Sequence, residues 1–245
     1  CITRGQRKVA ALVALTLGDP GSVGQVTGPV QEAKLSVHVN VLVPLETIVG
    51  VSEQGGRIGR TPCTADEIRD LLADAALGSS TIRLWKTLES DFPDHRVINR
   101  GFGGSQIADS TFFAERIIFP YEPRVVVLRA GGNDLHAGKT PAQVFADYQA
   151  FVARVHARLP QTRIVYIATN PTPARWAERD AARTLNAMIE AYTRPRPYLK
   201  YVETYDMVLG PDGRPRPELF APDRLHFSPE GYRLLTERVR PFLAE

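Results

Sequence analysis

The residues that carry the most chemical information lie near the end of the chain, in the run Asp223-Arg-Leu-His226. An Asp three residues before a His can place a carboxylate beside an imidazole. The carboxylate then fixes the tautomer of the ring and stabilises its protonated form, so the His can act as a general base. Such a pair is half of a hydrolytic site, and the other half requires a nucleophile and a group that binds an oxyanion.

Three loops rich in Gly and small polar residues could supply that other half. They are Gly-Ser-Ser-Thr (residues 78–81), Gly-Phe-Gly-Gly-Ser-Gln (101–106) and Gly-Gly-Asn-Asp (131–134). Glycines let backbone N–H groups approach a ligand closely, and donors that converge on one point make an oxyanion hole. Each loop alone is also explained by a turn or a helix cap. Their order along the chain, followed by Asp223 and His226, is more specific.

This order of motifs resembles that of the SGNH hydrolases, also called GDSL esterases or lipases, over roughly residues 76–245. Ser80, Gly104, Asn133 and His226 fall on the four letters of that name. The resemblance implies that Ser80 is the nucleophile, that His226 moves its proton, and that Asp223 orients His226. It also implies an oxyanion hole made by the backbone N–H groups of Ser80 and Gly104 and the side-chain amide of Asn133. The reaction would pass through an acyl-enzyme without a metal or cofactor.

The segment before Ser80 departs from the family pattern. Ser79 stands where the family usually has Asp, and residues 71–77 are good helix formers with a central Asp74, where the resemblance implies a hydrophobic strand. Whether this segment forms that strand decides whether Ser80 can reach His226. An earlier Gly18-Asp19 mimics the first motif, but Pro20 occupies the position of the nucleophile.

Four other residues could either lie in the functional site or have a purely structural role. Arg129, in an otherwise apolar strand, either faces a helix carboxylate or points at the pocket. Trp176 either forms part of an acyl or sugar site or packs against the sheet. His136 follows the third loop closely enough to line the pocket, whereas His156 lies in a helical pattern and is predicted to be structural.

From residue 96 onward the sequence alternates between predicted strands and predicted helices. The strands are expected at residues 96–99, 124–129, 163–168 and 200–204. The helices are expected to begin at Thr140, near Glu178 and at Ser228. This alternation predicts an α/β fold, a three-layer α/β/α sandwich with a mainly parallel sheet, which the resemblance also implies (flavodoxin-like). Active sites in such sheets lie at the carboxyl ends of the strands.

The first quarter of the chain differs from the rest. We predict an N-terminal extension over residues 1–63 and a catalytic domain over 64–245, which begins with a helix capped by Thr64. Residues 35–43 alternate partly like a strand. Basic residues before an apolar run at 9–17 resemble a signal peptide, although a buried strand or helix explains the run equally well, and a lipidated Cys1 is a third interpretation. Localisation, cytoplasmic or exported, therefore stays open.

The bulk composition excludes several classes of protein. With 43% hydrophobic and 23% charged residues the 245-residue chain has a globular composition. The 30 basic and 27 acidic residues give a net charge of +3, without a basic stripe for nucleic acid. No apolar run is long enough for stable membrane insertion. Cys1 and Cys63 are too few for a zinc site, although a bridge between them is possible.

The sequence as a whole predicts a serine esterase that acts on a small-molecule carboxylic ester with a short acyl chain. Two alternatives remain: an acyltransferase that delivers the acyl group to a sugar hydroxyl, and a non-catalytic carbohydrate- or lipid-binding module on the same fold. The acyl length, the alcohol and the oligomeric state are not determined by the sequence.

Overall fold

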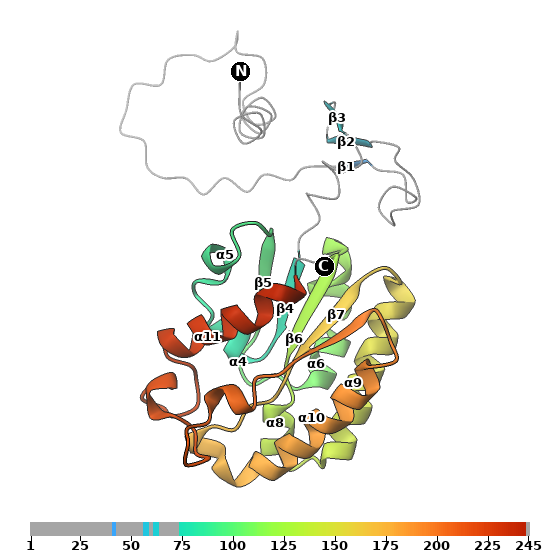
Figure 1. Cartoon of the computed structure of the whole chain (residues 1–245). Coiled ribbons are helices and arrows are strands. Elements are labelled where there is room, and N and C mark those ends of the chain that lie inside the picture. The colour runs from blue at the N-terminus through green and yellow to red at the C-terminus, as the bar shows by residue number, and fades with distance from the viewer. Residues whose placement is uncertain (1–40, 43–55, 59–60, 64–73, 244–245) are drawn as a thin grey trace, which may run out of the picture. The chain divides into compact units, whose positions relative to one another are not determined.

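A computed structural model describes residues 41–42, 56–58, 61–63 and 74–243 (Figure 1). The chain divides into two compact units, Cys1–Arg69 and Asp70–Glu245. The described part of the first unit is a small antiparallel sheet, in the order β1 (Val41–Leu42), β2 (Gly56–Ile58) and β3 (Thr61–Cys63). The signal-like segment, most of the expected strand at 35–43 and the helix expected after Thr64 lie outside the described residues.

The second unit is built on a five-stranded sheet in the order β5-β4-β6-β7-β8, in which all neighbouring strands are parallel. The strands are β4 (Asp74–Gly78), β5 (Val97–Gly101), β6 (Val125–Arg129), β7 (Arg163–Ile167) and β8 (Leu199–Val202). The longer helices are α6 (Ile107–Phe112), α9 (Pro141–Arg158), α10 (Arg179–Thr193) and α11 (Pro229–Val239). Short helices include α4 (Ser80–Arg83), α5 (Leu88–Asp91), α7 (Ala114–Ile117) and α8 (Gly132–His136).

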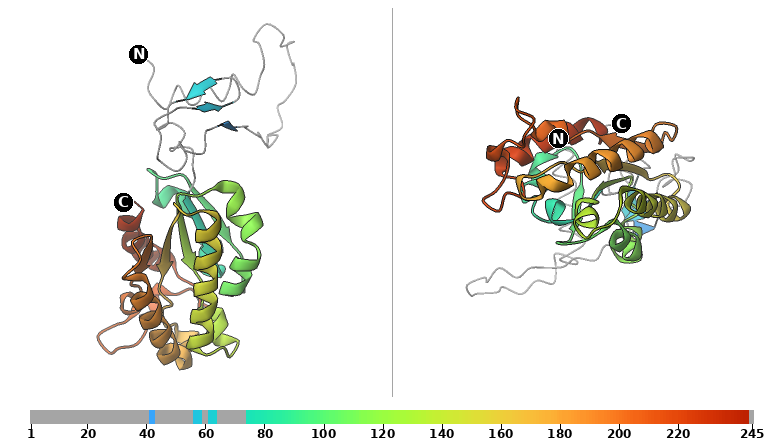
Figure 2. Two further views of the ribbon diagram at one scale, coloured as in Figure 1. Left: turned by 90° about the vertical axis from the view of Figure 1, so that its right-hand side faces the viewer. Right: turned by 90° about the horizontal axis from the view of Figure 1, so that it is seen from below.

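Alternation along the buried strands divides the apolar side chains between two cores. In β6, Val126 and Leu128 pack into one core with α6, α9 and α10, whereas Val125 and Val127 pack into the other with α4, α5 and α11. Helices therefore cover both faces of the sheet, as Figure 2 shows from two further sides. The predicted three-layer α/β/α sandwich is confirmed.

The helix-prone segment before Ser80 does form a strand, β4, which is fully buried between β5 and β6. Tertiary pairing here outweighs the helix propensity of its Ala and Leu residues. The strand ends at Gly78, whose φ of +128° suits Gly alone, since an added Cβ would fall 2.0 Å from the carbonyl oxygen of Arg129. The chain can therefore turn tightly, and it enters α4 at Ser80.

The helix caps expected from the sequence are confirmed at two helices. The Thr140 hydroxyl accepts a hydrogen bond from the N–H of Gln143 and begins α9, with Pro141 at the first position. The Ser228 hydroxyl caps α11 in the same way. The first and third Gly-rich segments, expected as loops, instead run into the short helices α4 and α8. Glycine and small polar residues are common both in turns and at the start of helices, so these residue types alone do not distinguish the two.

Candidate active site

Three candidate residues from two distant parts of the sequence lie in hydrogen-bond contact. Ser80 follows the central strand β4, whereas Asp223 and His226 belong to the segment that precedes α11. The Oγ of Ser80 is 2.8 Å from Nε2 of His226. The other ring nitrogen, Nδ1, is 2.6 Å from Oδ2 of Asp223. The structure therefore joins the candidate nucleophile, the candidate base and a carboxylate in one chain of contacts.

The protonation pattern of this chain follows from what each group can donate. An ionised carboxylate only accepts hydrogen bonds, so Nδ1 of His226 carries the proton and Nε2 accepts from the Ser80 hydroxyl. The hydrogen bond from the His226 ring, with those from the backbone N–H groups of His226 and Leu225, lowers the pKa of Asp223 to about 2. Asp223 is thus ionised at neutral pH, as the orientation of His226 requires.

The three oxyanion candidates lie at the ends of β4, β5 and β6. Ser80 is the first residue of α4, where backbone N–H groups have no acceptor within the helix. Gly104 has a φ of +77° in the segment after β5, and its N–H donates no hydrogen bond to any residue that the structure describes. Asn133 donates one hydrogen of its amide to the carbonyl oxygen of Ser105 at 2.9 Å. The second hydrogen of that amide remains for a ligand.

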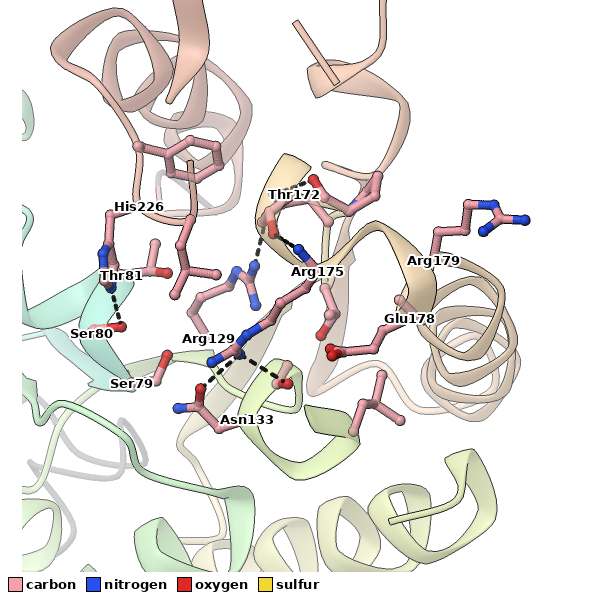
Figure 3. A pocket seen from close by; sticks show the side chains of 18 residues that line it. Ser79, Ser80, Thr81, Arg129, Asn133, Thr172, Arg175, Glu178, Arg179 and His226 are labelled. Carbon is pink, nitrogen blue, oxygen red and sulfur yellow. Dashed lines mark hydrogen bonds between the residues drawn. The ribbon is translucent and has the colours of Figure 1, made fainter. Parts of the chain in front are cut away.

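Arg175 fixes the orientation of the Asn133 amide from its other side. Its Nη1 donates to Oδ1 of Asn133 at 2.9 Å and to the carbonyl oxygen of Gly132 at 3.3 Å (Figure 3). With the oxygen held by a cation, the amide nitrogen must face Ser105 and the space beyond it. Arg175 was not among the candidates from the sequence, although its position after the carboxyl end of β7 was an available signal.

A buried carboxylate ties the second loop to the third. Asp134 is fully buried, and its two oxygens accept from the N–H of Ile107 at 3.3 Å each. Nζ of Lys139 donates to the same carboxylate at 3.2 Å. Burial raises the pKa of Asp134 against these favourable contacts. Because Ile107 begins α6 and Asp134 lies in α8, this contact sets the spacing between Gly104 and Asn133.

The site opens into a small cavity of about 60 Å³. Ser80 and His226 line it together with Arg129, which settles the open question about that arginine: it lies in the cavity lining, and no ion pair joins it to a carboxylate among the described residues. Asn170, which binds Arg129, also lines the cavity and was missed in the sequence. It follows β7, as Asn133 follows β6.

The remaining candidates have structural contacts. His136 lies outside the cavity lining, with Nδ1 2.7 Å from Oε1 of Glu178. Trp176 also lies outside it, and its ring contacts the guanidinium groups of Arg179 and Arg214, 5.0 and 4.9 Å from its centroid. The ring of His156 stacks on that of Tyr198, with centroids 4.2 Å apart.

Two classes of feature are not found in the part of the chain that the structure describes. It holds no group of three or more His, Cys, Asp or Glu side chains that could bind a metal ion. Within the same residues, none of the helices combines the length and apolar character that crossing a membrane requires.

Comparisons with known proteins agree with this geometry. The model of the GDSL-like lipase/acylhydrolase family matches residues 68–234. A GDSL-like lipase from Bacteroides thetaiotaomicron has a TM-score of 0.63 at 21% identity, over 72% of this chain and 89% of its own. A catalytic mutant of the acetylxylan esterase Axe2 from Geobacillus stearothermophilus has a TM-score of 0.55 at 14% identity, over 69% of this chain and 92% of its own.

The search of curated protein sequences found no match. At such low identities the two solved structures establish the fold alone. The family match is stronger evidence, since it covers more than half of the chain and includes all five candidate residues of the triad and oxyanion hole. The chain therefore belongs to the GDSL-like lipase/acylhydrolase family, whose members are carboxylic ester hydrolases.

Proposed function

We propose that this protein is a serine esterase that hydrolyses carboxylic esters with short acyl groups through an acyl-enzyme. The observation that carries the proposal is the continuous chain of contacts from Ser80 through His226 to Asp223, at 2.8 and 2.6 Å. A nucleophile, a base and a group that orients the base, each within hydrogen-bond reach of the next, are the signature of covalent acyl transfer.

In the proposed reaction the Oγ of Ser80 attacks the ester carbonyl carbon while Nε2 of His226 takes the hydroxyl proton. Negative charge develops on the carbonyl oxygen, where the N–H groups of Ser80 and Gly104 and the Asn133 amide would bind it. The imidazolium then returns its proton to the leaving alcohol, and Ser80 keeps the acyl group. Water, deprotonated by His226, releases the acid and restores Ser80.

The preference for short acyl groups rests on the size and lining of the cavity. A volume of about 60 Å³ is far below the roughly 300–1,000 Å³ of pockets that hold drug-sized ligands. Charged and polar side chains such as Arg129, Asn170 and Arg175 form much of its wall. A long alkyl chain would desolvate these groups without giving them hydrogen bonds in return. An acetyl group avoids most of that cost.

A fluorophosphonate probe and a chain-length series test both parts of the proposal. The probe is expected to label the protein, and Ser80→Ala should abolish the labelling and the turnover of p-nitrophenyl acetate. The exposed Ser90, whose hydroxyl donates to the Thr87 carbonyl, provides the matched Ser90→Ala control and should keep both. Labelling that survives Ser80→Ala would refute the nucleophile. A kcat/KM that rises from the acetate to the octanoate ester would refute the short-chain preference.

The same residues would serve transfer of the acyl group to a sugar hydroxyl, so the products need to be identified as well. With an acetyl ester and a saccharide acceptor, an esterase should yield free acetate, whereas an acyltransferase would yield acetylated sugar. No turnover of any ester, together with no probe labelling, would favour a binding module instead.

A further inference from the structure

Arg129 is a buried cation in the wall of the proposed active-site cavity. It is the last residue of β6, and it is only 6% exposed. Figure 3 shows its guanidinium among the side chains that line the cavity, together with Ser80 and His226. Burial of a charge is costly unless hydrogen bonds and an opposite charge compensate it. Its partners therefore show whether the protein itself provides that compensation.

The described residues satisfy only a small part of this guanidinium. Nη2 donates to Oδ1 of Asn170 at 2.6 Å, whereas the buried Nε–H has no acceptor. A guanidinium offers five N–H donors in one plane, so most of them have no partner in the described part of the chain. The ionisable groups that act on it are the phenols of Tyr166, Tyr201 and Tyr232, which are neutral at neutral pH. Burial accordingly lowers the pKa of Arg129.

Asp134, a few residues along, shows how the protein compensates a buried charge that serves only its structure. Its carboxylate accepts from the Ile107 N–H and pairs with Lys139 at 3.2 Å. Arg129 is also buried, yet among the described residues it has one hydrogen bond, to Asn170, and no opposite charge. The difference between the two is position, because Arg129 faces a cavity that a ligand can enter.

Arginines outnumber carboxylates in the lining of the cavity. Its lining includes three arginines, Arg129, Arg175 and Arg179, and one glutamate, Glu178. Glu178 is engaged by His136 at 2.7 Å, and Arg179 pairs with Asp180 at 3.2 Å. Arg175 bonds the neutral oxygens of Asn133 and Gly132, so its charge is not cancelled by them. A small cleft with positive walls concentrates anions.

We propose that this cavity binds a carboxylate, and that the preferred ester substrates carry a carboxylate within a few bonds of the scissile carbonyl. The inference rests on the proposed function for the ester part of the substrate. The amine hydrogens of Arg129 that have no partner among the described residues would bind the carboxylate. A planar carboxylate with two oxygens matches the edge of a guanidinium.

Two pairs of esters of equal size test the charge requirement with the full chain. O-acetylglycolate and O-acetylglycolamide differ by a carboxylate on the alcohol side, and monomethyl succinate and methyl succinamate differ by one on the acyl side. Each kcat/KM is divided by the rate constant for hydroxide-catalysed hydrolysis of the same ester. We expect the carboxylate to be favoured about 10- to 100-fold in at least one pair, as a bidentate charged contact typically gives.

Substitution of Arg129 tests whether the preference for the carboxylate ester arises in the cavity. Arg129→Met should reduce the ratio within that pair to about threefold or less, and Arg129→Lys should retain part of it, because it keeps the charge and loses the planar fork. The matched control is Arg154→Met on α9, an arginine that pairs with Glu115 and lies outside the cavity lining. It should leave the ratio unchanged. An unchanged ratio in Arg129→Met, with probe labelling intact, overturns the proposal.

A binding measurement separates this inference from the proposed function. Ser80→Ala protein, titrated with O-acetylglycolate by calorimetry, should bind it at least tenfold more tightly than O-acetylglycolamide, and the added Arg129→Met should remove the difference. Hydrolysis without any carboxylate preference would leave the esterase proposal standing and refute the anion site. Carboxylate binding through Arg129 without turnover would support the anion site and refute the esterase proposal.

Discussion

Charged side chains are buried at both ends of the parallel sheet, but their surroundings differ. At the amino end of β4, Oδ2 of buried Asp74 lies 3.5 Å from Arg124 and 3.4 Å from His95, which partly compensate the charge, although Oδ1 has no partner among the described residues. At the carboxyl ends, Ser80 and Arg129 face a cavity. The strands are paired at both ends of the sheet, so the stability of the sheet does not require Ser80 and Arg129 to face a cavity. A buried cation without an opposite charge, at the carboxyl ends where parallel sheets bind ligands, therefore indicates where a ligand binds.

The carboxyl end is also where segments far apart in the sequence meet. Ser80, Gly104 and Asn133 follow β4, β5 and β6, which are neighbours in the sheet, so parallel pairing alone brings them to one edge. His226 reaches the same edge from the segment before α11. If this difference between the two ends is real, substitutions at one end should change catalysis and those at the other should change stability.

Loss of His226 should have the largest effect on catalysis. His226→Ala removes the group that accepts the Ser80 proton, and we expect kcat for p-nitrophenyl acetate to fall roughly 10⁴- to 10⁶-fold, the range for loss of a triad histidine. The melting temperature should barely change, because the ring is partly exposed. The control at the amino end is His95→Ala, which should keep kcat. If His226→Ala retained a tenth of the activity, the proposed triad would be wrong.

Asn133→Ala should have the next largest effect. Removal of one oxyanion donor typically costs about 10²–10³ in kcat, because the donor binds charge that exists only in the transition state. We expect KM to change little, since the substrate carbonyl carries less charge than the intermediate. Steady-state kinetics with p-nitrophenyl acetate measures both constants. An effect on KM alone would place Asn133 in substrate binding instead.

Arg175 should contribute to catalysis by orienting the Asn133 amide rather than by contacting the substrate. Arg175→Met leaves the Asn133 amide free to rotate, and we expect kcat to fall about tenfold for the neutral substrate p-nitrophenyl acetate. A double-mutant cycle tests this role. In the Asn133→Ala background the added Arg175→Met should cost less than about twofold, because no amide remains to be oriented. Full additivity of the two effects would show that Arg175 acts independently of Asn133.

The sequence predicted those parts of the molecule whose signals are local. The caps at Thr140 and Ser228 and the β-branched strand β6 follow from residues close in sequence, and all three form as expected. Strand β4 could not be read in this way, because Ala and Leu favour helix in isolation and form a strand here through pairing with β5 and β6.

The same distinction applies to the site. Asp223, His226, Ser80, Gly104 and Asn133 were candidates because motifs carry them, and the structure brings Ser80, His226 and Asp223 into hydrogen-bond contact. Contacts between residues far apart in the sequence could not be predicted. Which way Arg129 faces depends on the register of β6, and the contact of Arg175 with Asn133 joins residues 42 positions apart.

Asp74 at the amino end should affect stability and leave catalysis unchanged. Burial raises the pKa of this carboxyl despite the nearby Arg124 and His95. The folded protein therefore holds the Asp74 proton more tightly than the unfolded chain does, and the contribution of Asp74 to the free energy of unfolding falls as the pH rises through the folded-state pKa.

Asp74→Asn imitates the protonated form, so at pH 7 it should raise the melting temperature by about 2 °C, the shift that somewhat under 1 kcal/mol gives in a domain of this size. Below about pH 4 Asp74 becomes protonated in both the folded and the unfolded wild-type protein. The melting temperatures of the wild type and of Asp74→Asn should therefore converge there. Activity should stay within about twofold, because Asp74 and Gly78 lie at opposite ends of β4, four residue steps or about 13 Å apart. A lower melting temperature at pH 7 would mean that attraction to Arg124 and His95 outweighs the cost of burial, and that the amino end is compensated more completely than its geometry indicates.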